Sequence, residues 1–309
     1  MNRESGVALI TAVMVVAFAS TAAATLMVKQ NLAVHRSANL LAQDQAWWYL
    51  IGLEEWAATL LDRDREDNEI DHLGEPWAQP VDFLPVDQGA LSGSLEDLQG
   101  RFNLRGLIQG AAQEEEKARF VRLLRGIEEW RSAPVEDLAT RIIDWMDADT
   151  QPGFPGGAED SVYLSREIPH RTPNREIASL SELLLIDGME RELYASLLPH
   201  VTFLPADTRI NVNTATAPVL LSIHEEMTPA QVDAIITQRL DTPYESAQDF
   251  VADEILQMTL QPEAFAVQSE YFLARGAASV GNVRIGFVSL LERKGGGRTQ
   301  VLAHSRNAL

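Results

Sequence analysis

Apolar and polar positions fall into blocks along the chain, and the first block is a long apolar run. Residues 7–28 carry no charged side chain, with Arg3 and Glu4 before the run and Lys29 after it. As a helix these 22 residues rise about 33 Å, which is enough to cross a hydrocarbon core of about 30 Å. The run therefore predicts a membrane-spanning anchor, while Ala22-Ala23-Ala24 leaves a cleaved secretory signal as the alternative.

The helical pattern continues beyond the apolar run. From Leu32 to Leu61 there is no Pro and a single Gly, Gly52, and apolar residues recur at a spacing that leaves one apolar face. The span and this segment are therefore predicted to form one long helix that ends near Leu61. We interpret Trp47, Trp48 and Trp56 as core residues of that helix, packed against a sheet.

The middle of the chain changes from a loop back to helical spacing. Charged residues crowd positions 62–71 and Pro76, Pro80 and Pro85 follow, so the long helix is expected to end and a loop to begin. Short strands or turns are expected at residues 91–95 and 100–104. Helical spacing of apolar residues then returns in three segments, at residues 114–130, 135–146 and 179–198.

Two segments of this region start alike and indicate an internal repeat. Phe102-Asn103-Leu104 opens the first run of helices, and Ile210-Asn-Val-Asn-Thr-Ala215 opens the second. The second run, with Ala234-Ile-Ile-Thr-Gln-Arg239 on a later helix, resembles the helix-hairpin-helix or SAM-like module. DNA-binding versions present a glycine hairpin and basic residues to phosphate, whereas the hairpin at residues 223–229 has two acids, no Gly and no Lys or Arg. We therefore interpret the module as a structural scaffold.

An acidic segment rich in Gly and Pro is the clearest candidate for chemistry. Five carboxylates fall within 17 residues, namely Asp144, Asp147, Asp149, Glu159 and Asp160. Calcium takes six to eight oxygen ligands, and Asp147, Asp149 and Glu159 could supply several of them from one loop. The segment is not an EF-hand, because Pro152 stands where that loop needs Gly and the closing acid comes one position late. Mutual repulsion favours a bound cation, with a solvated acidic turn as the alternative. Paired carboxylates also hydrolyse glycosides, but nothing nearby indicates a sugar cleft.

The C-terminal part switches to strand patterning. From Val283 to Leu291 the residues alternate with one face more apolar, which is typical of a strand with one buried side. Three strands are expected, at residues 272–278, 283–292 and 299–304, joined as an antiparallel meander. This sheet would cover the apolar stripe of the first helix, with residues of roughly 100–260 as an insertion.

Composition narrows the function classes. The chain of 309 residues has 45 acidic and 25 basic residues, a net charge of −20, and no Cys. Disulfides, thiolate zinc sites, iron–sulfur clusters and cysteine nucleophiles are therefore excluded. The negative charge opposes nucleic-acid binding and favours calcium or a basic partner surface. The six His residues show no metal-binding spacing, and no serine-hydrolase, phosphate-loop or dinucleotide motif is present, so an enzyme is not expected.

The first residues add a processing signal. A short polar leader ends in Gly6 directly before the apolar Val7, which resembles the class III signal of type IV pilin-like proteins. By that resemblance a prepilin peptidase cuts between Gly6 and Val7 on the cytoplasmic side. Most members carry Glu at the fifth mature position, where this chain has Thr11. A buried carboxylate in an apolar bundle is costly unless it is paired, so a subunit without it suits the end of a filament, where no further subunit lies above.

Taken in order along the chain, these features resemble the K-type minor pseudopilins of the type II secretion system. The features are the leader, Thr11, the α-rich insertion, Ile-Ile-Asp-Trp-Met-Asp-Ala-Asp with its downstream acids, and Ile-Asn-Val-Asn-Thr-Ala. The resemblance implies an α+β, type IV pilin-like fold, in which a long N-terminal helix packs on a C-terminal antiparallel sheet and a large α-helical SAM-like insertion interrupts the chain. We expect a leader (1–6), the transmembrane and periplasmic halves of the helix (7–28 and 29–62), a loop with the first strands (63–100), the inserted α-domain (101–262) and the β-meander (263–309).

The same resemblance implies a role and partners. The family sits in the bacterial inner membrane as a single-pass protein with its C-terminal domain in the periplasm, and it is cut and N-methylated by the prepilin peptidase. It caps the tip of the pseudopilus with the I- and J-type minor pseudopilins, possible further partners being the H-type and the major pseudopilin, and it helps to export folded periplasmic proteins. Structural Ca²⁺ near the acidic loop is implied, with Asp147, Asp149, Glu159 and Asp160 as first ligands and Asp144 as a further one.

Two other functions stay open at this point. A membrane-anchored helix-hairpin-helix protein would bind DNA with salt-sensitive affinity, which the acidic hairpin opposes. An anchored hydrolase using the acidic cluster would lose activity on Asp147→Ala with its fold intact, whereas a structural calcium site would lose stability first.

Overall fold

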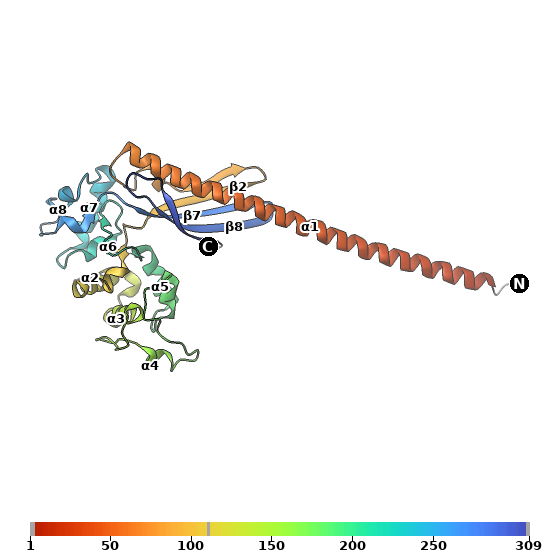
Figure 1. The fold of residues 1–309 in the computed structure, drawn as a ribbon, viewed down its shortest axis with the longest axis horizontal. Coiled ribbons are helices and arrows are strands. Elements are labelled where there is room, and N and C mark those ends of the chain that lie inside the picture. Colours follow the sequence, from red (N-terminus) through yellow and green to blue (C-terminus); the bar gives the residue numbers. More distant parts are fainter. Residues whose placement is uncertain (1–3, 110–111, 307–309) are drawn as a thin grey trace.

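The computed structural model describes residues 4–109 and 112–306, with side chains from residue 9 onward. Helix α1 (Glu4–Asp67) is a single helix whose N-terminal half projects away from the rest of the protein (Figure 1). Its apolar part is long enough to cross a membrane. The helix ends at Asp67, later than the predicted end near Leu61. The charged turns stay helical because they contact the C-terminal loop: Asp62 accepts a hydrogen bond from the Thr299 N–H (2.9 Å) and Arg65 donates to the Lys294 carbonyl (2.6 Å).

A five-stranded antiparallel sheet lies beside the second half of α1. Its strand order is β1-β2-β7-β8-β9, with bounds Val81–Val86, Gly89–Asp97, Tyr271–Val280, Val283–Glu292 and Gln300–Arg306. The predicted C-terminal meander is therefore confirmed, and β7 and β8 pair along their whole length. Strand β1 lies where the prolines predicted only a loop. Pro85 is tolerated because β1 is an edge strand, where a missing N–H breaks no ladder bond.

The core of this pilin-like body forms between α1 and one face of the sheet. Leu50, Leu53 and Leu61 of α1 are buried against apolar residues of β2, β7 and β8. Gly276 permits the close approach, since a Cβ there would lie 2.8 Å from a methyl carbon of Leu53. Each buried Leu contributes roughly 1.5–3 kcal/mol, so this stripe holds the helix on the sheet.

The prediction that the tryptophans of α1 are core residues is wrong for two of them. Trp48 is 69% exposed and Trp56 is 47% exposed. Trp56 lines the rim of the cavity between α1 and the β1–β2 edge, beside Leu53 and Val81, and is only partly covered there. Trp47 is half-buried, with its ring 5.1 Å from that of His304 on β9. The buried indole of this body is instead Trp77, in the short 3-10 helix η1 (Pro76–Ala78), which packs edge-on against Phe272.

The α-rich part consists of two modules, each closed by a short parallel strand pair. In the first, β3 (Phe102–Asn103) pairs with β4 (Val201–Thr202); in the second, β5 (Ile210–Asn211) pairs with β6 (Phe265–Ala266). This arrangement agrees with the predicted internal repeat. The second module extends to Phe265 and Ala266, beyond the expected boundary at residue 262, because β6 completes its strand pair. One hydrophobic cluster runs through both modules, so they share a core.

The helices of the first module are mostly short. They are η2 (Leu104–Leu107), α2 (Gln113–Gly126), η3 (Glu128–Trp130), α3 (Val135–Met146), α4 (Asp160–Tyr163), η4 (Leu180–Leu185), α5 (Arg191–Leu197) and η5 (Leu198–His200). The helix predicted over residues 179–198 is thus divided into η4 and α5. Gly188 between them has φ +82°, a left-handed conformation that ends regular helix and that Gly adopts without strain.

The second module has α6 (Ala217–Ser222), α7 (Pro229–Asp241), α8 (Ala247–Val251) and η6 (Pro262–Ala264). Helix α7 begins with a capping box, in which Thr228 and Gln231 each satisfy the other's backbone N–H. Both modules lie at the end of the molecule opposite to the projecting half of α1 (Figure 1). The long helix therefore separates the apolar N-terminal segment from the bulky α-rich domain.

Candidate functional site

The acidic loop follows directly from the end of α3. Asp147, Asp149 and Glu159 each offer a carboxylate oxygen, and these oxygens all lie within 4.8 Å of one another. Glu159 is 3% exposed and Asp147 is half-buried, while Asp149 faces solvent. The loop therefore gathers three negative charges around one point, with one side open to solvent.

Three buried side-chain oxygens, two of this group and one of Asn174 in the same part of the structure, accept no hydrogen bond from the described residues. They are the buried Oδ1 of Asp147, Oε1 of Glu159 and Oδ1 of Asn174. Buried carboxylate oxygens are costly unless a donor or a cation compensates them. Carboxylate and amide oxygens are the ligands that calcium prefers, so the donor set fits a hard divalent cation.

Burial and the neighbouring negative charges also raise the pKa values of two of these carboxyl groups. Burial, and then the charge of Asp149, raises the pKa of Asp147 to about 6. Burial also raises the pKa of Glu159, against the hydrogen bond that its carboxylate accepts from the Thr172 hydroxyl (2.9 Å). A cation among these oxygens would oppose both shifts, because it stabilises the charged carboxylates.

The other two acids of the predicted set have different contacts. Asp144 is buried, and its carboxylate accepts hydrogen bonds from the backbone N–H groups of Gly153 (3.1 Å) and Ala158 (2.8 Å). A Cβ at Gly153 would lie 2.8 Å from Asp144 Oδ1, so Gly lets the loop fold onto the carboxylate. Asp160 accepts from the N–H and hydroxyl of Thr172, both at 3.1 Å. Asp144 and Asp160 thus shape the loop around the three-carboxylate group.

Asn174 was not among the residues predicted from the sequence. Its side-chain amide donates to the backbone carbonyl of Asp149, and its backbone has φ +42°, which Asn tolerates better than most residues. A search for acids overlooks it, because it is neutral and lies 15 residues beyond Glu159. A neutral Asn from a separate segment can be recognised as a candidate ligand only once the fold shows that it lies beside the acids.

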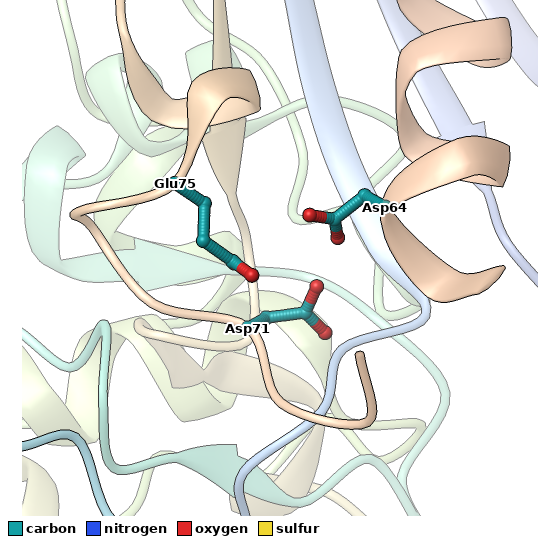
Figure 2. A group of neighbouring side chains, drawn as sticks. All are labelled: Asp64, Asp71 and Glu75. Carbon is teal, nitrogen blue, oxygen red and sulfur yellow. The ribbon is translucent and has the colours of Figure 1, made fainter. Parts of the chain in front are cut away.

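A second acidic group lies where α1 meets the following loop. Asp64, Asp71 and Glu75 point toward one another (Figure 2). Arg293 of the segment after β8 is 2% exposed and pairs with both Asp64 (3.0 Å) and Asp71. Glu75 accepts from the Trp77 indole N–H (2.7 Å) and from Asn68. The guanidinium supplies the positive charge here, so this group is a buried ion-pair network.

The ion-pair network also joins the pilin-like body to the second module. The side-chain amide of Asn211, in β5, donates to the Asp71 carbonyl (3.1 Å), to Asp97 Oδ2 (3.0 Å) and to the Ser269 hydroxyl (3.0 Å). Burial raises the pKa of Asp97 to about 6 and, with the charge of Glu75, that of Asp64 to about 7. The Ile-Asn-Val-Asn-Thr-Ala segment is thereby anchored by its first Asn.

The residues of the helix-hairpin-helix pattern are used inside the second module. Arg239 is buried and donates to the carbonyls of Val212 and Ala215, both at 2.7 Å. Asn213 accepts from the Tyr244 N–H and donates to the Tyr244 carbonyl, both at 2.9 Å. These contacts agree with a scaffold, since the basic residue of the pattern is turned inward.

A Ser, a His and a Glu also meet between α1 and the sheet. The hydroxyl of Ser289 and the carboxylate of Glu54 both contact Nδ1 of His304, at 2.9 and 2.8 Å. A hydrolytic triad needs the Ser and the acid on opposite ring nitrogens. This contact therefore connects β8 and β9 to α1 and does not form a nucleophile.

The processing residues belong to the start of α1. Gly6 and Val7 lie in its first turns, while the side chain of Val7 and residues 1–3 of the leader are outside the described part of the chain. Thr11 lies in the projecting half of the helix and is exposed.

Comparisons with known proteins agree with this architecture. Two family models, both described as type II secretion system protein K, match residues 100–206 and 210–268, which are the two α-rich modules. Type II secretion system protein K of Pseudomonas aeruginosa is 37% identical over 97% of this chain and 92% of its own length, and that of Pectobacterium carotovorum is 33% identical over 95% and 94%.

The chain belongs to the type II secretion system protein K family. A solved structure is similar to this chain over the whole fold. One chain of the GspK-GspI-GspJ complex from enterotoxigenic Escherichia coli superposes with a TM-score of 0.73 at 26% identity. The match covers 89% of this chain and 100% of that chain. The expected pilin-like fold is confirmed, and the protein K identity makes the chain a minor pseudopilin of the type II secretion system. Its apolar N-terminal helix fits a single-pass membrane anchor.

Proposed function

We propose that this minor pseudopilin caps the tip of the type II secretion pseudopilus, starts its assembly and so helps to export folded periplasmic proteins. The supporting observation is the placement of the α-rich domain, at the end of the molecule opposite to the anchoring half of α1 (Figure 1). A subunit added above would meet this domain, whereas subunits below meet only the helix and the sheet. The protein is thereby suited to the end of a filament and to no position within it.

The proposed partners are the I- and J-type minor pseudopilins, followed by the H-type and the major pseudopilin. A relative of similar fold was solved as a GspK-GspI-GspJ complex. The test is to purify the full-length chain from membranes with its I- and J-type partners and to image filaments carrying a gold label on this chain. A stable three-protein complex and label at one filament end are expected; label along the whole filament would refute capping.

The proposed processing is cleavage between Gly6 and Val7 by the prepilin peptidase, followed by methylation of the new amino group. The body beyond the membrane would then lie in the periplasm. Mass spectrometry of the membrane-extracted chain should find N-methylated Val7 as the first residue. A chain that starts at Met1 or near Ala24 would contradict this proposal.

Calcium is the proposed structural cofactor of the acidic loop. Asp147, Asp149 and Glu159 would hold the ion together with the Asn174 amide oxygen, and the ion would supply the positive charge that the loop lacks. Asp144 and Asp160 would keep the loop in shape from outside the ligand set. Calcium thus orders the outer end of the first module, and no catalysis is assigned to it.

A further inference from the structure

A groove with a volume of about 670 Å³ lies between the sheet and the first module. Leu273 of β7 and its cross-strand neighbour Leu290 of β8 belong to the wall formed by the sheet. Leu180, Leu198 and Phe203 belong to the wall formed by the first module. All five side chains are half-buried, so the groove presents apolar surface to solvent.

The groove lies on the side of the sheet opposite to α1. Phe272 and Ala274 are core residues between the sheet and α1, and successive residues of a strand point to opposite faces, so Leu273 faces away from the helix. A helix that packs along α1 therefore does not reach the groove. Its occupant approaches from the outer side of the pilin-like body.

The charged side chains of the groove leave one positive charge in excess. Among the described residues that line it, three are ionisable, namely Glu96, Arg101 and Arg275. The single carboxylate of Glu96 accepts from Arg275 Nε at 3.1 Å and also pairs with Arg101. Burial lowers the pKa of Arg101, Glu96 opposes this shift, and the charge of Arg275 adds to it. The excess is local, since the whole chain has a net charge of −20.

The size, the apolar walls and the local charge together select a class of ligand. Sites for small molecules typically have volumes of about 300–1,000 Å³, lie between domains and combine apolar walls with a few polar groups. Arginine binds carboxylates through its planar fork of N–H donors. One excess positive charge matches the single charge of a carboxylate better than a phosphate monoester, which carries about −1.5 to −2 at pH 7.

We propose that this groove binds a fatty acid. The carboxylate would contact Arg275 and Arg101, and the hydrocarbon chain would lie along Leu273, Leu290 and Leu180. Such a ligand would touch the sheet and the first module at once, and would therefore tie the α-rich domain to the pilin-like body. This binding does not depend on the proposed role at the tip of the pseudopilus.

Decanoate is the probe for this site. The full-length chain is placed in phosphatidylcholine nanodiscs, because detergent tails would compete for an apolar groove. Bound decanoate is measured by equilibrium dialysis against protein-free nanodiscs, which corrects for uptake by the lipid. We expect saturable binding, and 1-decanol, which has the same tail and no charge, should bind at least tenfold more weakly. Absence of saturable binding, or equal affinity for decanol, would overturn the proposal.

Reversing one charge tests the contact with the carboxylate. The side chain of Arg275 is 48% exposed, so Arg275→Glu should leave the fold intact and weaken decanoate binding at least tenfold. Arg284→Glu is the matched control, because Arg284 is exposed and lies on the same face of β8 as Leu290, six residues away. Its affinity should equal that of the wild type. Equal weakening by both variants would indicate a general effect of charge and contradict this site.

Filling the groove tests the position of the hydrocarbon chain. Ala178 is exposed and lines the groove, so Ala178→Trp should abolish binding without lowering the melting temperature. Ala252→Trp, at an exposed alanine after α8, should bind like the wild type. Full binding by Ala178→Trp would place the ligand elsewhere.

The length of the ligand distinguishes a fatty acid from a protein's carboxyl terminus. Dodecanoate should bind more tightly than decanoate, by about fourfold for each added methylene that is buried. The peptide N-acetyl-Leu-Leu, with a free carboxyl group, should bind more weakly than decanoate. Tighter binding of the peptide would assign the groove to a chain terminus and overturn the fatty acid as its ligand.

Discussion

Neutralising one carboxylate of the acidic loop should have opposite effects with and without calcium. Two unit charges 4.8 Å apart repel by about 3 kcal/mol at an effective dielectric constant of about 20, and the ligand oxygens of Asp147, Asp149 and Glu159 are at most that far apart. Glu159→Gln removes two of the three repulsive pairs. Because Asp149 is exposed and screened, we expect a net gain of about 1 kcal/mol in chelator.

With calcium the order of stabilities should reverse. A ligand at 100 times its Kd stabilises the folded protein by about 2.7 kcal/mol, which for a domain of this size raises the melting temperature by about 5–10 °C. The wild type should show this rise and Glu159→Gln should lose most of it. The assay is thermal unfolding of the full-length chain in detergent, followed by circular dichroism in millimolar calcium and in excess chelator.

Two neighbouring acids serve as controls for this experiment. Asp160→Asn keeps an acceptor for Thr172 and should retain the full calcium shift. Asp144→Asn weakens the loop's own hydrogen bonds and should lower the melting temperature in calcium and in chelator alike. An unchanged calcium shift in Glu159→Gln, or no shift in the wild type, would refute the proposed site.

The pH dependence of the calcium shift follows from the raised pKa of Asp147, about 6 in the metal-free protein. Its folded pKa lies above the ordinary value of 3.8, so in chelator the stability that this group contributes is complete below about pH 4 and is lost as pH rises through 6. Protons and calcium compete for the same oxygens. The calcium-induced rise should therefore be smaller at pH 5 than at pH 7.5.

Three further outcomes test the remaining contacts. Arg293→Met leaves Asp64 and Asp71 buried without a cation and should lower the free energy of unfolding by about 3–5 kcal/mol in urea titrations, part of which Asp71→Asn should restore. Burial raises the pKa of Asp64 to about 7 and of Asp97 to about 6, so the stability that these two groups contribute is complete below about pH 4 and is lost between pH 5 and 8. In urea titrations with saturating calcium, Asp97→Asn should flatten the plot of unfolding free energy against pH near pH 6. Arg239→Met leaves the buried carbonyls of Val212 and Ala215 without this donor and should lower the free energy of unfolding by about 2–4 kcal/mol. Gel-shift assays of the wild type and of Arg239→Met should both show no DNA binding.

The spacing of apolar residues correctly predicted those helices and strands whose structure depends mainly on their own residues. The alternation from Val283 to Leu291 identified β8, and the helical spacing at residues 135–146 identified α3, because side-chain period and burial agree in both. Strand β1 was missed because Pro80 and Pro85 exclude a central strand, and only the topology reveals that β1 lies at an edge.

The tryptophans of α1 show a different limit of pattern reasoning. Successive residues of a helix point about 100° apart, so Trp47 and Trp48 cannot share one buried face. The spacing determines that some face of α1 is apolar, but the position of the sheet decides which residues are covered. Only the fold therefore separates the buried stripe around Leu50 from the exposed pair at Trp48 and Trp56.

The acidic residues of this chain owe their different roles to what the fold brings beside them. Asp71 meets a guanidinium, Asp144 meets two backbone N–H groups, and Asp147 and Glu159 keep buried oxygens without a donor from the described residues. In the sequence these acidic residues look alike. Counting them therefore identifies the acidic loop, but it does not identify which of them would bind a metal ion. The chemistry of each partner decides: a carboxylate already paired with an arginine has no need of a cation, and one already bonded to the backbone can only shape a site. The group left uncompensated is the one that a metal ion would complete, and this places the calcium prediction on Asp147, Asp149 and Glu159.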